Sequence, residues 1–179
     1  ETGREAEYRT MSADKERAIT AARRILEEHN IQRAPVPVER IIKSRNIVLD
    51  YAPLDEDLSG MAYSQDGVSM IGVNALHHPN RQRFSAAHEL AHHILHEERL
   101  HGEVHLSKGL RALRRDQVSS QGTDPLEIEA NTFASELLMP HQLLLDACGK
   151  EGLDLDDEAK VEKLANQRDA FAENDIELR

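Results

Sequence analysis

The feature that most constrains the fold of this chain is a short segment with two histidines, His88-Glu89-Leu90-Ala91-His92. It lies within residues 83–96, a run whose composition predicts a helix. Because positions four apart share one face of a helix, the two imidazoles can hold one zinc ion. The chain is therefore expected to fold around a helix that presents a metal site.

The surroundings of this pair on a helical wheel favour a sheltered site. One continuous apolar arc is formed by Phe84, Ala87, Leu90, Ala91, Ile94 and Leu95. His88 and His92 lie beside each other just past one edge of this arc, so they are partly sheltered yet open to a cleft. Glu89 lies further round on the same side. It is therefore predicted to act as a general base on water without binding the metal.

The third metal ligand has to come from elsewhere, because a catalytic zinc usually takes three protein ligands and leaves one position open. His96 is one further step of four along the helix, but it lies about 12 Å from His88 along the axis and cannot share the metal. The metzincin pattern needs a helix-breaking glycine and a further histidine at the positions that Leu95 and Glu98 occupy. That class of site is not expected.

A second predicted helix, over residues 126–138, offers a better candidate. Its apolar arc consists of Leu126, Ala130, Phe133, Ala134, Leu137 and Leu138. Glu127 falls within this arc, where a carboxylate is costly unless something compensates it, and a metal ion does so directly. An arginine partner for Glu127 is one alternative. Another is Glu129 as the ligand, although Glu129 and Glu136 are expected to face solvent.

Other side chains are assigned supporting roles. Asn131, one turn after Glu127, is expected to accept a hydrogen bond from the non-ligating nitrogen of His88. Candidates for stabilising an oxyanion or contacting substrate are Tyr63, His93 and His96. The expected metal is Zn²⁺, with Mn²⁺ as the alternative, because two imidazoles and a carboxylate suit several ions.

The pattern of turns, caps and apolar spacing predicts an α+β domain with a small antiparallel sheet and surrounding helices. The expected helices cover 13–29 with Ser12 as cap, a short stretch after Pro37, 80–97 with Asn80 as cap, 125–139 with Asp124 as cap, 141–147 and 157–170. The expected strands cover 47–51 and a hairpin of 60–64 and 68–73. The domain is placed at 12–148, between a disordered or vector-derived segment (1–11) and an acidic extension with a weak helix (149–179).

The composition excludes some classes of function. A net charge of −11 argues against a protein whose main function is nucleic-acid binding. The basic cluster from Lys108 to Arg115 is interpreted as a solvated face or as a lid over the cleft. No signal peptide is expected, and the given sequence holds no apolar run long enough to span a bilayer, so no membrane partner is expected. The lone Cys148 fits a reducing compartment, and the expected location is the cytoplasm.

Two blocks of the sequence together resemble the ImmA/IrrE-type metallopeptidases. The first is residues 83–96, and the second is Glu127-Ile128-Glu129-Ala130-Asn131 with the residues that follow to Pro140. The resemblance covers roughly residues 14–148. One departure is Ala91, where many members have glycine.

The resemblance implies a minimal zincin-like domain of the gluzincin type, with His88, His92 and Glu127 as ligands and Glu89 as base. It also implies the partner, since known members cut a helix-turn-helix repressor of the Xre type and so release stress-response or mobile-element genes. The leading hypothesis is therefore a protease of such a repressor. The alternative is a stoichiometric partner in a toxin–antitoxin-like pair. Substrate is expected to add as a strand to either strand of the hairpin.

Overall fold

The computed structural model describes residues 13–108 and 124–150. The contacts within the chain group it into two compact units, Glu1–Leu138 and Met139–Arg179. In the second unit, helix α8 spans His141–Lys150, where the sequence predicts a helix. Two predictions lie outside the described residues: the basic cluster beyond Lys108 and the helix over 157–170. The predicted cap Ser12 was wrong, because the first helix begins at Lys15 and Asp14 caps it, with its Oδ1 accepting from the backbone N–H of Arg17 at 2.9 Å.

The first unit contains a four-stranded sheet in the order β1-β3-β2-β4. The strands are β1 (Ile47–Ala52), β2 (Leu58–Gln65), β3 (Val68–Asn74) and β4 (His105–Lys108). β1 runs parallel to β3, while β2 is antiparallel to both β3 and β4. The predicted antiparallel sheet is thus corrected to a mixed one, because β3 inserts between β1 and β2 instead of lying outside them.

The predicted hairpin is confirmed, and its turn is well defined. Asp66 and Gly67 both have positive φ, at 53° and 79°, which is the backbone conformation of a two-residue type I′ turn. Along β2, the buried positions alternate with partly exposed ones. Gly60, Ala62 and Ser64 consequently face the interior, while Met61 and Tyr63 project from the opposite face of the sheet.

Within the described part of the first unit, the helices are α2 (Lys15–Glu28), α3 (Val38–Ser44), α4 (Pro79–Leu95), α5 (Glu97–Leu100) and α7 (Pro125–Leu138). Asp124 caps α7 as predicted, since its Oδ1 accepts from the backbone N–H of Leu126 at 2.9 Å. At α4 the predicted cap Asn80 was wrong. His78 occupies that place and accepts from the N–H of Asn80, because Pro79 already begins the helix.

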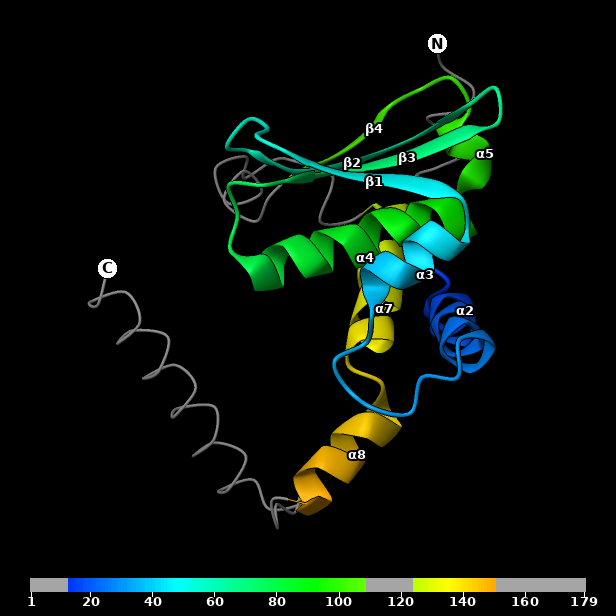
Figure 1. Ribbon diagram of the computed structural model, residues 1–179. Coiled ribbons are helices and arrows are strands. Elements are labelled where there is room, and N and C mark those ends of the chain that lie inside the picture. The colour runs from blue at the N-terminus through cyan, green and yellow to red at the C-terminus, as the bar shows by residue number, and fades with distance from the viewer. Residues whose placement is uncertain (1–12, 109–123, 151–179) are drawn as a thin grey trace, which may run out of the picture. The chain divides into compact units, whose positions relative to one another are not determined.

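Figure 1 shows α4 running beneath the sheet, with α7 and α2 on the side of α4 away from the strands. α7 packs against both α2 and α4, so helices that are far apart in the sequence are in contact. Four alanines of these helices are fully buried, and side chains this small suit closely packed helices: Ala22, Ala87, Ala91 and Ala134. The core is therefore built around α4, the helix with the histidine pair.

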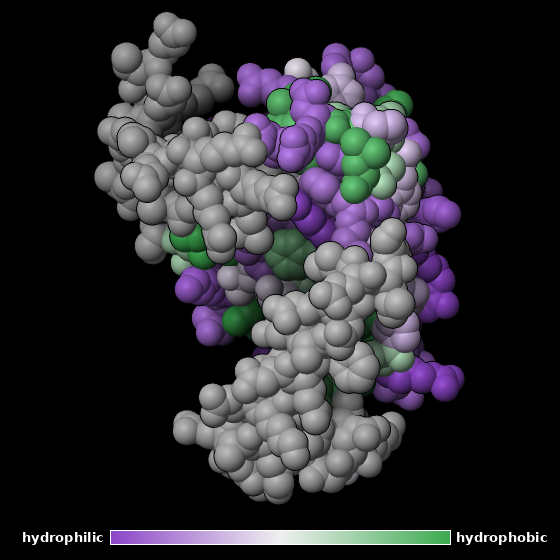
Figure 2. Space-filling model, turned by 90° about the vertical axis from the view of Figure 1, so that its left-hand side faces the viewer, coloured by the Kyte–Doolittle hydropathy of each residue, from purple (hydrophilic) through white to green (hydrophobic). Residues whose placement is uncertain are grey.

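The surface shows no membrane-spanning element among the described residues, since none of their helices is long and apolar enough to cross a bilayer. In the view of Figure 2, the described surface is mostly hydrophilic, and its hydrophobic side chains form small groups.

Candidate metal centre

The two histidines of α4 point their ring nitrogens at one another beneath the sheet. The Nε2 atoms of His88 and His92 are 3.2 Å apart, and the rings meet edge to face. Both residues are buried, at 5% and 1% exposure. The spacing of four residues thus places the two imidazoles on one face of α4, as the helical period predicts. The packing of α4 under the strands buries them.

Glu127 reaches this pair from the first turn of α7. Its Oε2 lies 3.2 Å from Nε2 of His88, and its Oε1 lies 3.5 Å from Nε2 of His92. The structure therefore brings together the three side chains that the sequence singled out as ligands. They come from two helices, and the contact of α7 with α4 places them.

A fourth donor, His105, is not among the residues that the sequence predicts. It is the first residue of β4, and its Nε2 lies 3.0 Å from Oε1 of Glu127. Its ring packs on that of His92 with a centroid separation of 3.9 Å. No local pattern could have identified this residue, because β4 joins the site only through its pairing with β2.

The four side chains fit a divalent cation. Their donor atoms all lie within 4.8 Å of one another. Zinc ligands at about 2.0–2.2 Å in a tetrahedron are separated from one another by roughly 3.3–3.6 Å. The separations in the cluster are 3.0 to 3.5 Å wherever the two atoms are in direct contact.

The ionisation of the cluster suits a cation as well. Burial raises the pKa of the Glu127 carboxyl, but the three surrounding histidines outweigh burial and hold that pKa well below its usual range. Burial lowers the pKa of His92 to about 3, which keeps its imidazole neutral. At His88, contacts with Glu127 and Glu89 outweigh burial and raise the pKa, so a cation would compete with a proton for its Nε2.

The Nδ1 atoms of His88 and His92, on the side of each ring away from the cluster, also have contact partners. The Nδ1 of His88 lies 3.0 Å from Oδ1 of Asn131, the residue assigned this role from the sequence. The Nδ1 of His92 lies 3.1 Å from Nδ1 of His96. If both Nε2 atoms face the cation, both Nδ1 atoms carry a proton and donate it, which fixes tautomer and ring orientation.

The chain of contacts from His92 continues to a buried carboxylate. Nε2 of His96 lies 3.0 Å from Oε2 of Glu129, so His96 accepts from His92 and donates to Glu129. Oε1 of Glu129 accepts from the backbone N–H of Asp14 at 2.8 Å. The prediction that Glu129 faces solvent was wrong, because the N-terminal end of α2 lies over this position and leaves Glu129 4% exposed.

Glu89 lies beside the cluster without belonging to it. It is fully buried, and among the described residues neither carboxylate oxygen has a hydrogen-bonding partner. Burial raises the pKa of this carboxyl, which makes it a stronger base. A Cβ at Gly60 of β2 would lie 2.7 Å from Oε1 of Glu89, so the absence of a side chain there makes room for the carboxylate.

The three candidates for oxyanion stabilisation lie outside the donor cluster. Tyr63 projects from the opposite face of β2, and its hydroxyl donates to Oε1 of Gln65. Nε2 of His93 lies 3.1 Å from the carbonyl oxygen of Met70 and donates to it. Both ring nitrogens of His96 already have partners, His92 and Glu129. Their role toward an oxyanion stays a prediction.

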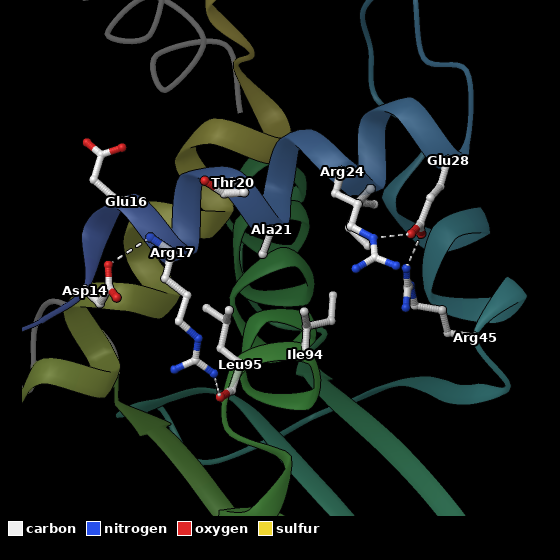
Figure 3. Close-up of a pocket in the computed structure, with 11 residues that line it drawn as sticks. Asp14, Glu16, Arg17, Thr20, Ala21, Arg24, Glu28, Arg45, Ile94 and Leu95 are labelled. Carbon is white, nitrogen blue, oxygen red and sulfur yellow. Dashed lines mark hydrogen bonds and ion pairs between the residues drawn. The ribbon is translucent and has the colours of Figure 1, made fainter.

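A separate pocket of about 630 Å³ lies between α2 and the C-terminal part of α4 (Figure 3). Its three arginines are already paired: Arg17 donates to the carbonyl of Leu95, and Arg24 and Arg45 both bind Glu28. None of the four donors of the cluster lines it. The pocket therefore has no part in the metal centre.

Comparison with known proteins agrees with this geometry. Residues 42–168 match the model of peptidase family M78, described as an IrrE N-terminal-like domain. The match covers most of the chain, which belongs to this family, and the predicted ImmA/IrrE resemblance is confirmed. The family is one of metallopeptidase type, and the histidine–glutamate cluster fits a metal site in such a protein. The comparison with curated proteins returned no match.

Proposed function

We propose that this protein is a zinc-dependent endopeptidase that cleaves a helix-turn-helix transcriptional repressor of the Xre type in the cytoplasm, and so derepresses stress-response or mobile-element genes. The observation that carries the peptidase activity is the convergence of His88, His92 and Glu127 beside a buried carboxylate, Glu89, that is not among the donors. Family membership supports the substrate class.

The residues divide into those that hold the cation and those that move protons. His88, His92 and Glu127 would hold it, and the nitrogen-rich donor set favours zinc over manganese, which prefers oxygen ligands. When bound, the cation lowers the pKa of water and polarises the scissile carbonyl. Asn131 and His96 orient the two imidazoles.

Glu89 carries the acid–base chemistry in this proposal. Its carboxylate takes a proton from the attacking water and delivers it to the leaving amine. The dry environment beneath β2 raises the pKa of Glu89, which brings the strength of the base closer to that needed at neutral pH. The fully buried position keeps the carboxylate from pairing with bulk cations.

The edge that would receive substrate differs from the sequence expectation. Neither strand of the hairpin is an edge, because β3 lies between β1 and β2, and β2 lies between β3 and β4. Among the described strands, β4 is the terminal one beside the cluster. We therefore assign the outer edge of β4 as the place where an extended peptide adds next to the metal.

The test is a comparison of newly formed protein N-termini in cells of the source organism that express either the wild-type chain or Glu89→Gln. Cleavage of an Xre-type regulator that depends on Glu89 is the expected result. An absence of any Glu89-dependent N-terminus would contradict the peptidase. Cleavage confined to unrelated proteins would contradict only the substrate class.

The same pair of strains separates the enzyme from a stoichiometric partner. A protein that acts by sequestering a regulator keeps its cellular effect when Glu89 is replaced, because the binding surface is unchanged. Loss of derepression in Glu89→Gln, with equal amounts of protein, would support catalysis.

A further inference from the structure

The position of His105 sets it apart from the residues that merely surround the centre. Its Nε2 is buried and has no hydrogen-bonding partner among the described residues, although Oε1 of Glu127 lies only 3.0 Å away. The two atoms are close, but the contact does not meet the geometry of a hydrogen bond. A buried polar nitrogen without a partner is costly, and a shared cation would satisfy it.

We propose that His105 is a fourth protein ligand of the cation, and that it closes the centre until substrate engages β4. The distance from its Nε2 to a carboxylate oxygen of Glu127 is close to the separation expected between two ligands of one zinc ion. The same holds for the Nε2 atoms of His88 and His92. All four donors belong to one cluster of imidazole nitrogens and a carboxylate oxygen. Four protein ligands complete a tetrahedral zinc shell, whereas catalysis needs one open position.

The four donors differ in how firmly they are held. The side chains of His88 and His92 are 7% and 2% exposed and lie in the middle of α4, and their outer nitrogens contact Asn131 and His96. The side chain of His105 is 27% exposed and stands at the first position of a terminal strand. His105 is therefore the donor that can leave with the least rearrangement.

The location of His105 on β4 also links its release from the cation to the binding of substrate. This step rests on the proposed function, in which a peptide adds to the outer edge of β4. His105 pairs with Ala62 of β2 on the inner side of that strand, so a peptide on the outer side adjusts the backbone that carries the imidazole. Closure by His105 would keep the centre inert in the absence of substrate.

The first experiment counts imidazoles around zinc by X-ray absorption spectroscopy of the zinc-loaded full chain. The wild type should show three imidazoles, and His105→Phe should show two. Phenylalanine keeps a ring packed on His92 but offers no donor nitrogen. The matched control is His101→Ala, which removes an exposed imidazole just before β4 and should still show three.

The spectra can overturn the proposal in two ways. Two imidazoles in the wild type would exclude His105 as a ligand, and this result needs no variant that folds. Three imidazoles in both the wild type and His105→Phe would assign the third to another histidine.

The second experiment measures zinc affinity and peptide cleavage on the same variants. Loss of an outer partner of a ligand weakens metal binding by about 10–100-fold, so loss of a ligand should weaken it by about 100-fold or more. With zinc in excess, cleavage by His105→Phe should be faster than that by the wild type, because the variant lacks the closing ligand. Unchanged zinc affinity with a lower kcat would instead make His105 a donor to the oxyanion and would overturn the proposal.

The two proposals fail separately. Three imidazoles without cleavage of any repressor would leave His105 as a ligand and remove the proposed function. Cleavage of the repressor by a centre with two imidazoles would keep the function and remove the fourth ligand.

Discussion

The carboxylate of Glu89 illustrates how a single side chain depends on neighbours far away in the sequence. Its position on α4 follows from the helix, but the space it fills is left by Gly60 on β2. Ser107 of β4 is paired with Gly60 across the strands and is buried there as well. The proposed base is thus enclosed by backbone and small residues.

Replacement of Glu89 by Gln should remove the proton acceptor without disturbing the metal ligands. General acid–base catalysis contributes about 10²–10⁴-fold, so kcat should fall by that factor. The zinc content of the purified variant should equal that of the wild type, as measured by atomic emission. Wild-type kcat in this variant would exclude Glu89 as the base.

Replacement of Gly60 by Ala should displace the same carboxylate by steric contact. The new Cβ would lie 2.7 Å from Oε1 and 3.1 Å from Cγ of Glu89, and 3.1 Å from the carbonyl oxygen of Gly72. A misplacement of about 1 Å can cost about 100-fold in rate, and overpacking costs about 1–3 kcal/mol of stability.

The measurement is kcat on a cleaved peptide together with urea unfolding. The control is Gly149→Ala, because a Cβ at Gly149 meets nothing within 4 Å. Equal rates in the two variants would show that Glu89 is not confined by β2.

At the scale of elements, α2 and α7 together support one of the proposed metal ligands on α4. Glu129 of α7 receives a hydrogen bond from the N-terminal end of α2 and another from His96, which contacts His92. The three helices meet at this buried carboxylate. Their packing and the orientation of the His92 ring are consequently linked.

Replacement of Glu129 by Ala should weaken zinc binding by about 10–100-fold, the usual effect of removing an outer partner of a ligand. Glu129→Gln should bind zinc more tightly than the alanine variant, because the amide oxygen still accepts from Nε2 of His96. The measurement is competition against a chromogenic zinc chelator.

The control for this prediction is Glu136→Ala on the same helix. Glu136 pairs with Arg23, whose side chain is 59% exposed, and such a surface pair contributes little. Equal zinc affinities in Glu129→Ala and the wild type would show that the contacts of His96 do not orient His92.

At the scale of the whole molecule, the metal should stabilise the fold. Three histidines and a carboxylate from α4, α7 and β4 meet at one point, so a cation there ties these elements together. A ligand at 1,000 times its Kd adds about 4 kcal/mol to the free energy of unfolding. Tm should therefore rise with buffered free zinc and fall on addition of a chelator.

The thermal prediction is checked by calorimetry at a series of zinc concentrations. His88→Ala should abolish most of the zinc dependence, since it removes a central donor. A Tm that is the same with zinc and with chelator would contradict a metal site in this cluster.

The sequence predicted correctly those features that depend on a single helix, strand or turn. The pair His88 and His92 shares a face because a helix has a period of 3.6 residues, and the Asp66-Gly67 turn is specified by its own backbone preference. Glu127 was found because it interrupts an apolar arc. These inferences needed only the periodicity of a single segment.

By itself, then, the sequence determined the family, the α+β class and three of the four side chains of the cluster, because short-range periodicity and motif spacing encode them. Only the tertiary structure decided that His105 joins them, that Glu129 is buried and that β3 lies between β1 and β2. The physical reason is the same in each case. Contacts between segments far apart in the chain depend on how helices and strands pack, and no spacing along the sequence specifies that packing.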